Sequence, residues 1–533
     1  MNRRVWPFGL VAVLVGVWVV IGGLRDGIPA WWAGPSHGLT EGGPGRLHAI
    51  LLGALLIVLG WGLERRRLVA WAAMVLLLGS AALGVDHTPW GALVVGYAIG
   101  LVLCHSAFGT RPDRSHLRAA LRYGGLALVA AVLYGIAAHR GLAPGLGWPT
   151  SVLAVTLVLV CTALRSAPAP EPSGEAERAR VRWLVGRPDA DTLAPFALRA
   201  DKTYLFSEDG TAAVGYRVLL GVAVVGGDPV GDPAAFADVV NRFLALCERR
   251  GWRPAVLGAR GDLVQLWNSH RLRSIGIGDE VVLEVPGFGL AGRKMRNVRQ
   301  AVARTRNSGV HTCVVRAGEL SDQTRAELAT LSARSLGSAR ERGFSMIQDG
   351  LFDARHPDAL FVLAVQDGRV VGFQRYLDVG GSAALSLDTM RREPGRFNGL
   401  NERMIVDVAE YARERGIGRV SLNFAAFREL LDKGAQRGRV ERVGYRLLHL
   451  LDPLIQVESL YLFNAKFRPG YQPRSVVIGT WMALPRVLFA LLGLEFALPY
   501  DVRRKRVEAV GAPTVDPDGA TAEPFGRQAP VHR

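Results

Sequence analysis

The pattern of apolar and polar positions divides the chain near residue 166. Six apolar runs precede this point, at about residues 5–24, 47–63, 68–84, 91–108, 119–138 and 151–165. A helix that crosses a bilayer needs about 20 apolar residues, which the first run supplies. The second, third and sixth runs are short, so five spans are an alternative to six. The pattern predicts a multi-pass α-helical membrane domain in residues 1–166, with about six transmembrane helices.

Basic residues gather in alternate loops between these runs. They lie at Arg3 and Arg4, in ERRR at 64–67, in RPDRSHLR at 111–118 and after Arg165, whereas the intervening loops hold few. Cytoplasmic loops carry the excess of Lys and Arg, so both chain ends and everything after the last run are expected in the cytoplasm. No carboxylate or lysine stands out inside the runs, and a transport pathway built on ionisable residues is not predicted.

Hydrophobicity drops after the membrane half. Residues 167–180, which begin APAPEPSGE, predict a linker. The stretches TYLFS and AAVGYRVLLGVAVVG then predict strands, and residues 233–250 predict an amphipathic helix with Pro233 in its first turn. PAVLGA and EVVLEV predict two more strands.

A second series of similar order follows. Residues 321–337 have helical periodicity, and ALFVLAVQDGRVVGFQRYLDV predicts a hairpin with Asp-Gly at its turn. A strand at SAALSLDTM, a helix at 398–415 and a strand at GRVSLNFAAF complete the series. This order resembles the acyltransferase fold of the GCN5-related N-acetyltransferase (GNAT) type. We therefore predict an α+β tandem acyltransferase-like (GNAT-type) domain after the membrane domain.

The two units of the tandem are expected at residues 181–315 and 316–500, and the second carries the catalytic site and a membrane-proximal helix. That helix is predicted at 481–497, WMALPRVLFALLGLEFA, where Pro485, Arg486 and Glu495 interrupt an apolar run. The run is short for a span and suits an interfacial helix; a buried core helix is the alternative. Residues 501–533 predict a disordered basic tail.

Composition adds a strong positive charge. The 533 residues carry a formal net charge of +17, and 49% of them are hydrophobic. Such a balance favours anionic partners, namely nucleic acid or acidic lipid head groups, although solubility and the loop bias alone are an alternative. The four cysteines show no metal-binding or disulfide spacing, so neither a metal nor a cofactor is predicted.

Four stretches carry a family resemblance. They are GRKMRNVRQAVARTRNSG at 292–309, SLDTMRREP at 386–394, NGLNERMIVDVAEYARERGIGRVSLNFAAFREL at 398–430 and ESLYLFNAKFRPGYQPR at 458–474. Together they resemble the synthase domain of the lysyl-phosphatidylglycerol synthase, or multiple peptide resistance factor, family over roughly residues 175–500. The actinobacterial members are the most similar.

The resemblance implies a membrane-bound transferase that moves an amino acid from its tRNA to the headgroup of phosphatidylglycerol, and so gives resistance to cationic peptides. The implied partners are aminoacyl-tRNA, phosphatidylglycerol and anionic membrane lipid, with a homo-oligomer as a further expectation. The implied location is a bacterial cell membrane, with a cytoplasmic catalytic domain. Lysine is the first candidate amino acid, while alanine, ornithine and arginine remain alternatives.

The resemblance also implies catalytic residues. Asp388 and Arg391 form a D-x-x-R pair that lies in the family's active site. Asp388 either binds the substrate α-ammonium or acts as a base, and Arg391 either holds a phosphate or orients Asp388. Lys466 is expected to pair with tRNA or lipid phosphates. The alternatives are a surface salt bridge for the first pair and a basic membrane-proximal loop for Lys466.

Further residues are candidates for substrate binding. Arg474 is expected to bind phosphate, and Tyr471 either stacks on the terminal adenine or fills the core. Glu402 either recognises the lysine side chain or serves the helix dipole. Asn423 is a weaker candidate in the same site.

The run RKMRNVRQAVARTR predicts a helix with a basic stripe that includes Arg296 and Arg299, opposite Met295, Val298 and Val302. Such a stripe suits tRNA phosphates or anionic lipid, and a solvated face is the alternative.

Two other functions remain open at this point. One is a non-catalytic, membrane-anchored protein that binds tRNA or lipid, which explains the charge without needing Asp388. The other is an acyl-CoA-dependent GNAT acyltransferase. That activity needs a glycine-rich pyrophosphate loop at a helix start, and the sequence offers only a degenerate form, RFNGLN at 396–401.

Overall fold

The computed structural model describes most of the chain, from the first apolar helix to residue 495. The described ranges are 6–24, 45–82, 89–109, 114–141, 148–337, 350–352, 356–381, 383–395, 398–426 and 462–495. The expected tail at 501–533 lies outside them.

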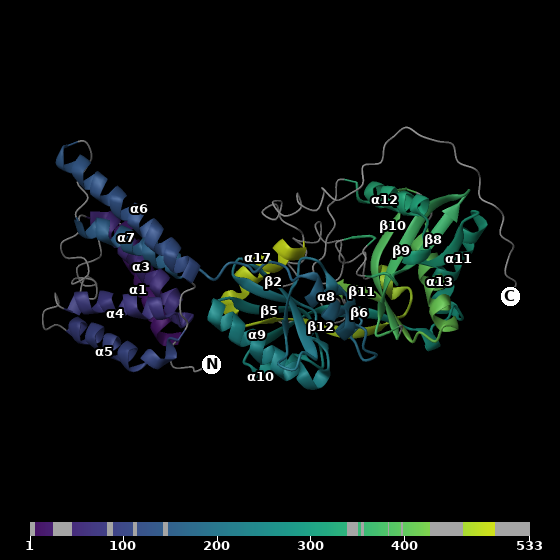
Figure 1. Ribbon diagram of the computed structural model, residues 1–533, viewed down its shortest axis with the longest axis horizontal. Coiled ribbons are helices and arrows are strands. Elements are labelled where there is room, and N and C mark those ends of the chain that lie inside the picture. Colours follow the sequence, from purple (N-terminus) through teal and green to yellow (C-terminus); the bar gives the residue numbers. More distant parts are fainter. Residues whose placement is uncertain are drawn as a thin grey trace.

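Six helices occupy the six apolar runs and form the bundle at the left of Figure 1. They are α1 (Trp6–Leu24), α3 (Gly45–Glu64), α4 (Leu68–Ala82), α5 (Pro89–Leu103), α6 (Arg114–His139) and α7 (Trp148–Ala163). By length and composition α1, α3 and α6 can each cross a membrane, and the other three are shorter apolar helices. The predicted helices are therefore confirmed, and their membrane topology stays a prediction.

Glycine lets α1 and α3 pack with their backbones almost in contact. A Cβ atom added to Gly53 would lie 2.5 Å from the carbonyl oxygen of Gly16, and one added to Gly60 would lie 2.7 Å from that of Gly9. Any side chain at these positions would force the helices apart. Small residues in such contacts are typical of helix pairs in lipid, where close packing replaces the hydrophobic effect.

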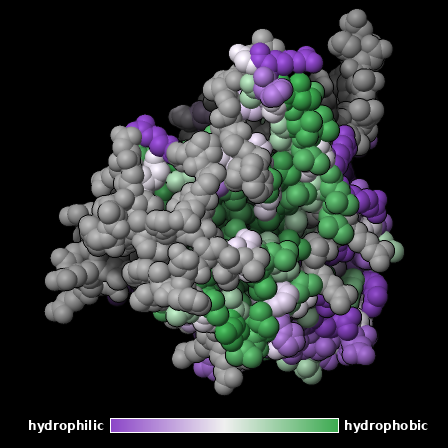
Figure 2. Space-filling model, turned by 90° about the vertical axis from the view of Figure 1, so that its left-hand side faces the viewer, coloured by the Kyte–Doolittle hydropathy of each residue, from purple (hydrophilic) through white to green (hydrophobic). Residues whose placement is uncertain are grey.

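The outer surface of the bundle is apolar. On α6 the side chains of Leu121 and Leu133 are 66% and 61% exposed. Figure 2, which views the end of the molecule that carries the bundle, shows apolar side chains gathered over this surface. A soluble domain rarely exposes such an area, so the surface is suited to lipid.

The strands of the described chain form one long mixed sheet, at the right of Figure 1. Its order is β1-β2-β3-β5-β12-β6-β11-β10-β9-β8-β7, with β4 paired to β2. The strands are β1 (Thr203–Phe206), β2 (Ala212–Leu219), β3 (Val222–Gly226), β4 (Val230–Gly231), β5 (Arg253–Arg260), β6 (Arg273–Glu284), β7 (His311–Arg316), β8 (Leu360–Gln366), β9 (Arg369–Val379), β10 (Ala384–Arg392), β11 (Arg419–Ala426) and β12 (Gly470–Ile478).

Helices cover both faces of this sheet. In the first half α9 (Phe236–Arg250) packs on the face that carries Val225, and α17 (Leu484–Glu495) packs on the opposite face through Val224. In the second half α11 (Arg296–Asn307) and α13 (Leu400–Glu414) share one face, whereas α12 (Asp322–Leu336) covers the other. The short helix α10 (Val264–Ser269) precedes β6. Successive side chains along each strand thus point to opposite faces of the sheet, and a separate hydrophobic core lies on each face.

The two units interlock, which corrects the boundaries expected at 181–315 and 316–500. Strand β12 lies in the predicted second unit, yet it pairs with β5 and β6 of the first. Strand β6 pairs on its other edge with β11. The 12-residue β6 offers both of its edges, so hydrogen bonding joins the units into one sheet.

The expected linker at 167–180 is also shorter than predicted. Helix α8 (Glu175–Val185) begins inside it, because Val181 and Leu184 are buried against the first unit. At the other end of the stretch, the amide of Ala167 donates a hydrogen bond to the carbonyl of Arg250 at 2.9 Å. The Pro-rich segment therefore packs against the first unit at both of its ends and is not an extended linker.

The helix predicted at 481–497 packs on the core through one face, and its interfacial role stays a prediction. Val487 and Ala490 of α17 are buried against the sheet, whereas Leu488 and Phe489 are 46% and 63% exposed. One face is therefore core, and the other leaves apolar side chains in position to meet a membrane surface.

A buried ion network lies where β12 joins the sheet. Arg474 is 0% exposed, and its guanidinium makes a bidentate contact with Asp191 at 2.7 and 2.9 Å. It also contacts Asp228 at 3.2 Å and the carboxylate of Glu280. Thr192 donates a further hydrogen bond to Glu280 at 2.5 Å. The expected phosphate-binding role of Arg474 is therefore corrected: the side chain faces three carboxylates of its own chain.

The carboxylates of this network differ in charge state. Burial and the neighbouring Asp191 raise the pKa of Asp228 to about 7. Burial also disfavours the ionised form of Asp191, but the Arg474 guanidinium outweighs it and holds the pKa of Asp191 below its ordinary value. The positive charge beside these closely spaced acids comes from Arg474, and from Arg260 at 4.0 Å from Asp191.

We predict that Arg474→Gln lowers the free energy of unfolding by about 3–5 kcal/mol, because it removes the one cation that contacts all three buried carboxylates. Urea unfolding of the full chain in detergent, followed by tryptophan fluorescence, measures this change. The matched control is Arg468→Gln at an exposed position six residues earlier. Equal unfolding midpoints for the two variants would contradict the structural role of Arg474.

Candidate functional site

The sheet opens between its two central parallel strands. β10 and β11 pair only from Ala384–Ser386 to Arg419–Ser421, although both strands continue beyond these residues. Each strand has a register shift at the point of separation, one in β10 next to Asp388 and one in β11 around Asn423. The strands therefore part at the place where sequence reasoning put a catalytic carboxylate.

Asn423 holds the two parting strands at a fixed distance. Its backbone has φ +72°, a left-handed conformation that Asn adopts more readily than most residues. Its side-chain amide donates a hydrogen bond to the carbonyl of Leu387 at 3.1 Å, immediately before Asp388. Asn423 thus positions the backbone of the site, which differs from the direct substrate contact expected for it.

Asp388 is buried and belongs to an ion pair. Its Oδ2 atom accepts hydrogen bonds from Nη1 of Arg375 at 3.0 Å and from Oγ1 of Thr389 at 3.1 Å. Both side chains of the ion pair are 1% exposed. Nε and Nη2 of Arg375 are buried and have no hydrogen-bond partner among the described residues. The site therefore contains unused donors beside its carboxylate, which is uncommon unless a ligand or water completes them.

Sequence reasoning missed Arg375, although a signal was present. The stretch VVGFQRYLDV places Gln374 and Arg375 between apolar residues inside a strand, and both side chains are buried. Arg391, the expected partner of Asp388, lies with it on β10. Its side chain is half-buried and donates a hydrogen bond to the Met390 carbonyl at 3.1 Å. Its phosphate-binding role stays a prediction.

Two other candidates come together at the start of α13. Nζ of Lys466 lies 2.8 Å from a carboxylate oxygen of Glu402, 64 residues away in the chain. The lysine side chain is 41% exposed and the glutamate side chain 13%. The ammonium also lies 5.2 Å from the ring of Phe463. A cationic substrate group that bound Glu402 would have to displace Lys466.

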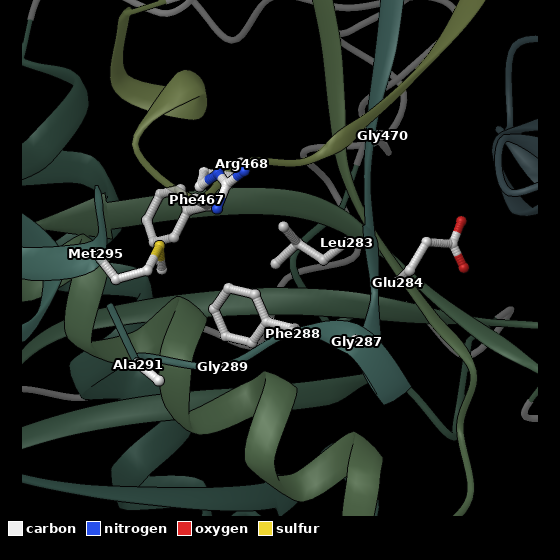
Figure 3. A pocket seen from close by; sticks show the side chains of 10 residues that line it. All are labelled: Leu283, Glu284, Gly287, Phe288, Gly289, Ala291, Met295, Phe467, Arg468 and Gly470. Atoms are coloured by element: carbon white, nitrogen blue, oxygen red, sulfur yellow. The ribbon is translucent and has the colours of Figure 1, made fainter. Parts of the chain in front are cut away.

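A cavity of about 450 Å³ opens on the same face of the sheet as α11 and α13. Its walls are the end of β6, the loop that follows, the start of α11 and the segment before β12. Figure 3 shows Phe288, Met295 and Phe467 turned toward one another in this cavity, with Arg468 beside them and Glu284 pointing away. The cavity therefore has an apolar patch within a lining that is otherwise polar, and Arg468 lies at its edge.

Two arginines hold the loop that lines the cavity. Nη1 of Arg299, on α11, donates hydrogen bonds to the carbonyls of Leu290 and Gly292, the latter at 2.7 Å. Arg413, on α13, donates to the carbonyls of Val285 and Phe288. The structure therefore assigns Arg299 a positioning role, which corrects the free phosphate contact expected for it. Sequence reasoning missed Arg413, because nothing in its helix distinguishes it from a solvated residue.

The rest of α11 presents the expected basic face. Met295, Val298 and Val302 are buried, which confirms the amphipathic pattern. Five cations on the other side of α11 and of the 3₁₀ turn that precedes it are exposed and form no ion pair with a described residue: Arg293, Lys294, Arg296, Arg304 and Arg306. Met295, on the opposite and buried side of this segment, lines the cavity. Tyr471 lies beside the core of the same face and is half-buried.

Residues 182–478 match the family model described as phosphatidylglycerol lysyltransferase, C-terminal. The chain belongs to this family. Membership makes it an aminoacyltransferase. An MprF-like domain protein of Mycobacterium tuberculosis is 41% identical over 384 residues, which cover 68% of this chain and 75% of that protein.

A second relative from the phosphatidylglycerol lysyltransferase family is much longer than the matched region. The lysylphosphatidylglycerol biosynthesis bifunctional protein LysX of Gordonia bronchialis is 38% identical over 323 residues, or 59% of this chain and 28% of LysX. The chain therefore matches less than a third of that bifunctional protein.

Two solved structures show the same fold. One is the C-terminal DUF2156 domain of an Agrobacterium fabrum protein described as a lysylphosphatidylglycerol synthetase, with 23% identity and a TM-score of 0.54 over 61% of this chain and 98% of that one. The other is L-PGS of Bacillus licheniformis, with 21% identity and a TM-score of 0.53 over 61% and 96%. They confirm the GNAT-like architecture of the C-terminal region and carry no evidence on substrate.

We predict that Arg299→Gln loosens the cavity loop. Loss of its hydrogen bonds removes about 1.5 kcal/mol of local stability, so amides of residues 285–292 should exchange roughly tenfold faster with deuterium. Hydrogen exchange with mass spectrometry of the full chain measures this rate. Arg304→Gln, at an exposed position further along the same helix, serves as control and should leave the loop unchanged.

Proposed function

We propose that this chain transfers an aminoacyl group, with lysine as the first candidate, from tRNA to the headgroup of phosphatidylglycerol. The observation that carries the proposal is the row of exposed cations along α11, together with the buried Asp388–Arg375 ion pair at the point where β10 and β11 part. Family membership supports the lipid product broadly. The tRNA donor and the choice of lysine are inferred from the charges on the surface.

The reaction exchanges one ester for another. The primary hydroxyl of the lipid headgroup attacks the carbonyl carbon of the aminoacyl ester and forms a tetrahedral intermediate. The carbon–oxygen bond to the tRNA ribose then breaks, and the proton of the lipid hydroxyl passes to the departing ribose oxygen. Bonds of the same type are made and broken, so the step needs positioning and charge stabilisation and no energy source.

Asp388 is proposed to anchor the α-ammonium of the aminoacyl group. The ion pair with Arg375 fixes the position of the carboxylate, and Asn423 fixes the backbone that carries it. Nε and Nη2 of Arg375, which have no hydrogen-bond partner among the described residues, belong to the guanidinium that contacts this carboxylate, and they can stabilise the developing oxyanion. Arg375 and Asp388 together therefore supply one anionic and one cationic contact to a zwitterionic transition state.

Glu402 is proposed to select a cationic side chain. In the structure it pairs with Lys466, which is itself an ammonium on a flexible alkyl stem. A lysyl group matches this partner in charge and shape, so substrate binding would exchange one ammonium for another. Lys466 would then be free to contact phosphate.

The contacts of Arg67 support the proposed cytoplasmic orientation. This residue belongs to the basic loop after α3, and its Nη2 donates hydrogen bonds to the carbonyls of Arg165 and Gly251, each at 3.4 Å. The loop therefore lies on the same side of the bundle as the catalytic region. The positive-inside rule puts that side in the cytoplasm, where aminoacyl-tRNA is available.

We predict that Asp388→Asn lowers the transfer rate about 100-fold or more, because the ammonium loses its anionic anchor. The measurement is incorporation of radiolabelled lysine from lysyl-tRNA into lipid, with full-length protein in phosphatidylglycerol vesicles. Asp322→Asn, on the exposed surface of α12, is the matched control. A wild-type protein that releases no labelled lipid above spontaneous hydrolysis would exclude the proposed reaction.

We predict that replacing Arg293, Arg296 and Arg306 by Gln raises KM for lysyl-tRNA and leaves kcat nearly unchanged. Each lost phosphate contact should reduce the slope of log KM against log salt concentration by about one. Arg242→Gln with Arg249→Gln on the exposed surface of α9 is the control pair. An unchanged salt slope in the triple variant would assign the tRNA to another surface.

A further inference from the structure

Three arginines surround one tryptophan where the helix bundle meets the catalytic region. Trp61 lies near the end of α3 and is 43% exposed. The guanidinium carbons of Arg486, Arg65 and Arg253 lie 5.1, 5.2 and 5.9 Å from the centre of its ring. They come from α17, from the loop after α3 and from the start of β5. Parts of the chain that are distant in sequence therefore concentrate positive charge at one point, which we call the seam cluster.

The chain neutralises the seam cluster only in part. Burial and the neighbouring arginines lower the pKa of both Arg65 and Arg253, and they outweigh the carboxylate of Glu64, which favours the charged forms. Nε and Nη2 of Arg65 and Nε of Arg253 are buried without a hydrogen-bond partner in the part of the chain that the structure describes. No described carboxylate lies within ion-pair distance of Arg65, Arg253 or Arg486. Burial, followed by the charges of Arg253 and Arg486, lowers the pKa of Arg65 to about 9. Partly buried like charges whose buried donors have no partner are unfavourable unless an anion joins them.

The surroundings of the seam cluster suit the level of lipid head groups. Arg65 directly follows α3, which is long and apolar enough to cross a membrane. Arg486 lies one helical turn before Phe489, which is 63% exposed on the outer face of α17. At the start of the same helical segment Trp481 is 53% exposed, and Arg273 lies 5.7 Å from its ring. Arginine beside exposed tryptophan and phenylalanine is typical of surfaces that sit at a membrane interface.

We propose that Arg65, Arg253 and Arg486 bind the phosphate of an anionic phospholipid, at a site separate from the reaction site. Guanidinium groups match phosphate oxygens in geometry and keep their charge when partly buried. The seam cluster meets the sheet at β5, four strands away from β10, which corresponds to roughly 19 Å. The bound lipid would fasten the catalytic region to the bundle and neutralise the cluster. The proposal depends on the proposed function only in placing the bundle in a bilayer.

The test uses the full chain reconstituted in phosphatidylcholine vesicles, with or without phosphatidic acid. We expect phosphatidic acid to raise the thermal unfolding midpoint of the wild-type protein and to raise that of the Arg65→Gln, Arg253→Gln double variant by less than half as much. Without anionic lipid the double variant should melt no lower than the wild type, because two incompletely compensated charges are gone. The Arg242→Gln, Arg249→Gln pair on α9 is the matched control and should respond as the wild type does.

Two outcomes would overturn the inference. One is equal stabilisation of the wild type and the double variant by phosphatidic acid, which would assign the lipid effect to other contacts. The other is an equal shift from soluble inorganic phosphate in phosphatidylcholine vesicles, which would show an ion site rather than a lipid site. Neither tRNA nor phosphatidylglycerol is present, so the result is independent of the proposed transfer reaction.

Discussion

The ion network around Arg474 is the constraint on which the catalytic region depends. One guanidinium on β12 faces carboxylates from the segment before the first sheet strand, from the turn after β3 and from β6. Burial makes each of these charges unfavourable alone, so the four groups are stable only when all of them are in place. The network therefore requires β12 to lie between β5 and β6, and this insertion joins the two units into one sheet.

The continuous sheet has consequences for the candidate site. With β12, β6 and β11 held in register, the separation of β10 from β11 occurs at a fixed place beside Asp388. The cavity beside α11 and the buried Asp388–Arg375 pair are then features of one rigid body built from both units. A reaction between two large substrates needs this kind of arrangement, because each must approach along its own path and meet the other in one orientation.

Arginine has three distinct roles in this protein, and the surroundings of each side chain decide which applies. Arg474 and Arg375 are ion-paired inside the core. Arg299 and Arg413 donate to backbone carbonyls and hold a loop. The exposed cations of α11 and those of the seam cluster form no ion pair within the described part of the chain, and they are the ones that point to external phosphate. The high net charge of the chain is therefore an incomplete guide to its partners.

Local sequence pattern determined the elements. The six apolar runs became helices, the Asp-Gly turn joined β8 to β9, and the amphipathic run at 292–309 became α11 with the expected side buried. These features depend on the periodicity of a few neighbouring residues, which the sequence displays directly. The family resemblance rested on short motifs and was confirmed by the family match.

Only the tertiary structure decided the partners of the charged residues. Lys466 pairs with Glu402 across 64 positions, Arg474 reaches Asp191 across 283, and Arg65 meets Arg253 and Arg486 at a junction of separate parts of the chain. The chemical character of a charged side chain is the same in each setting, whereas its burial and its neighbours come from packing. Spacing in the sequence carries no information about either, so the roles of Arg474, Arg299 and Arg375 emerged only when the chain was folded.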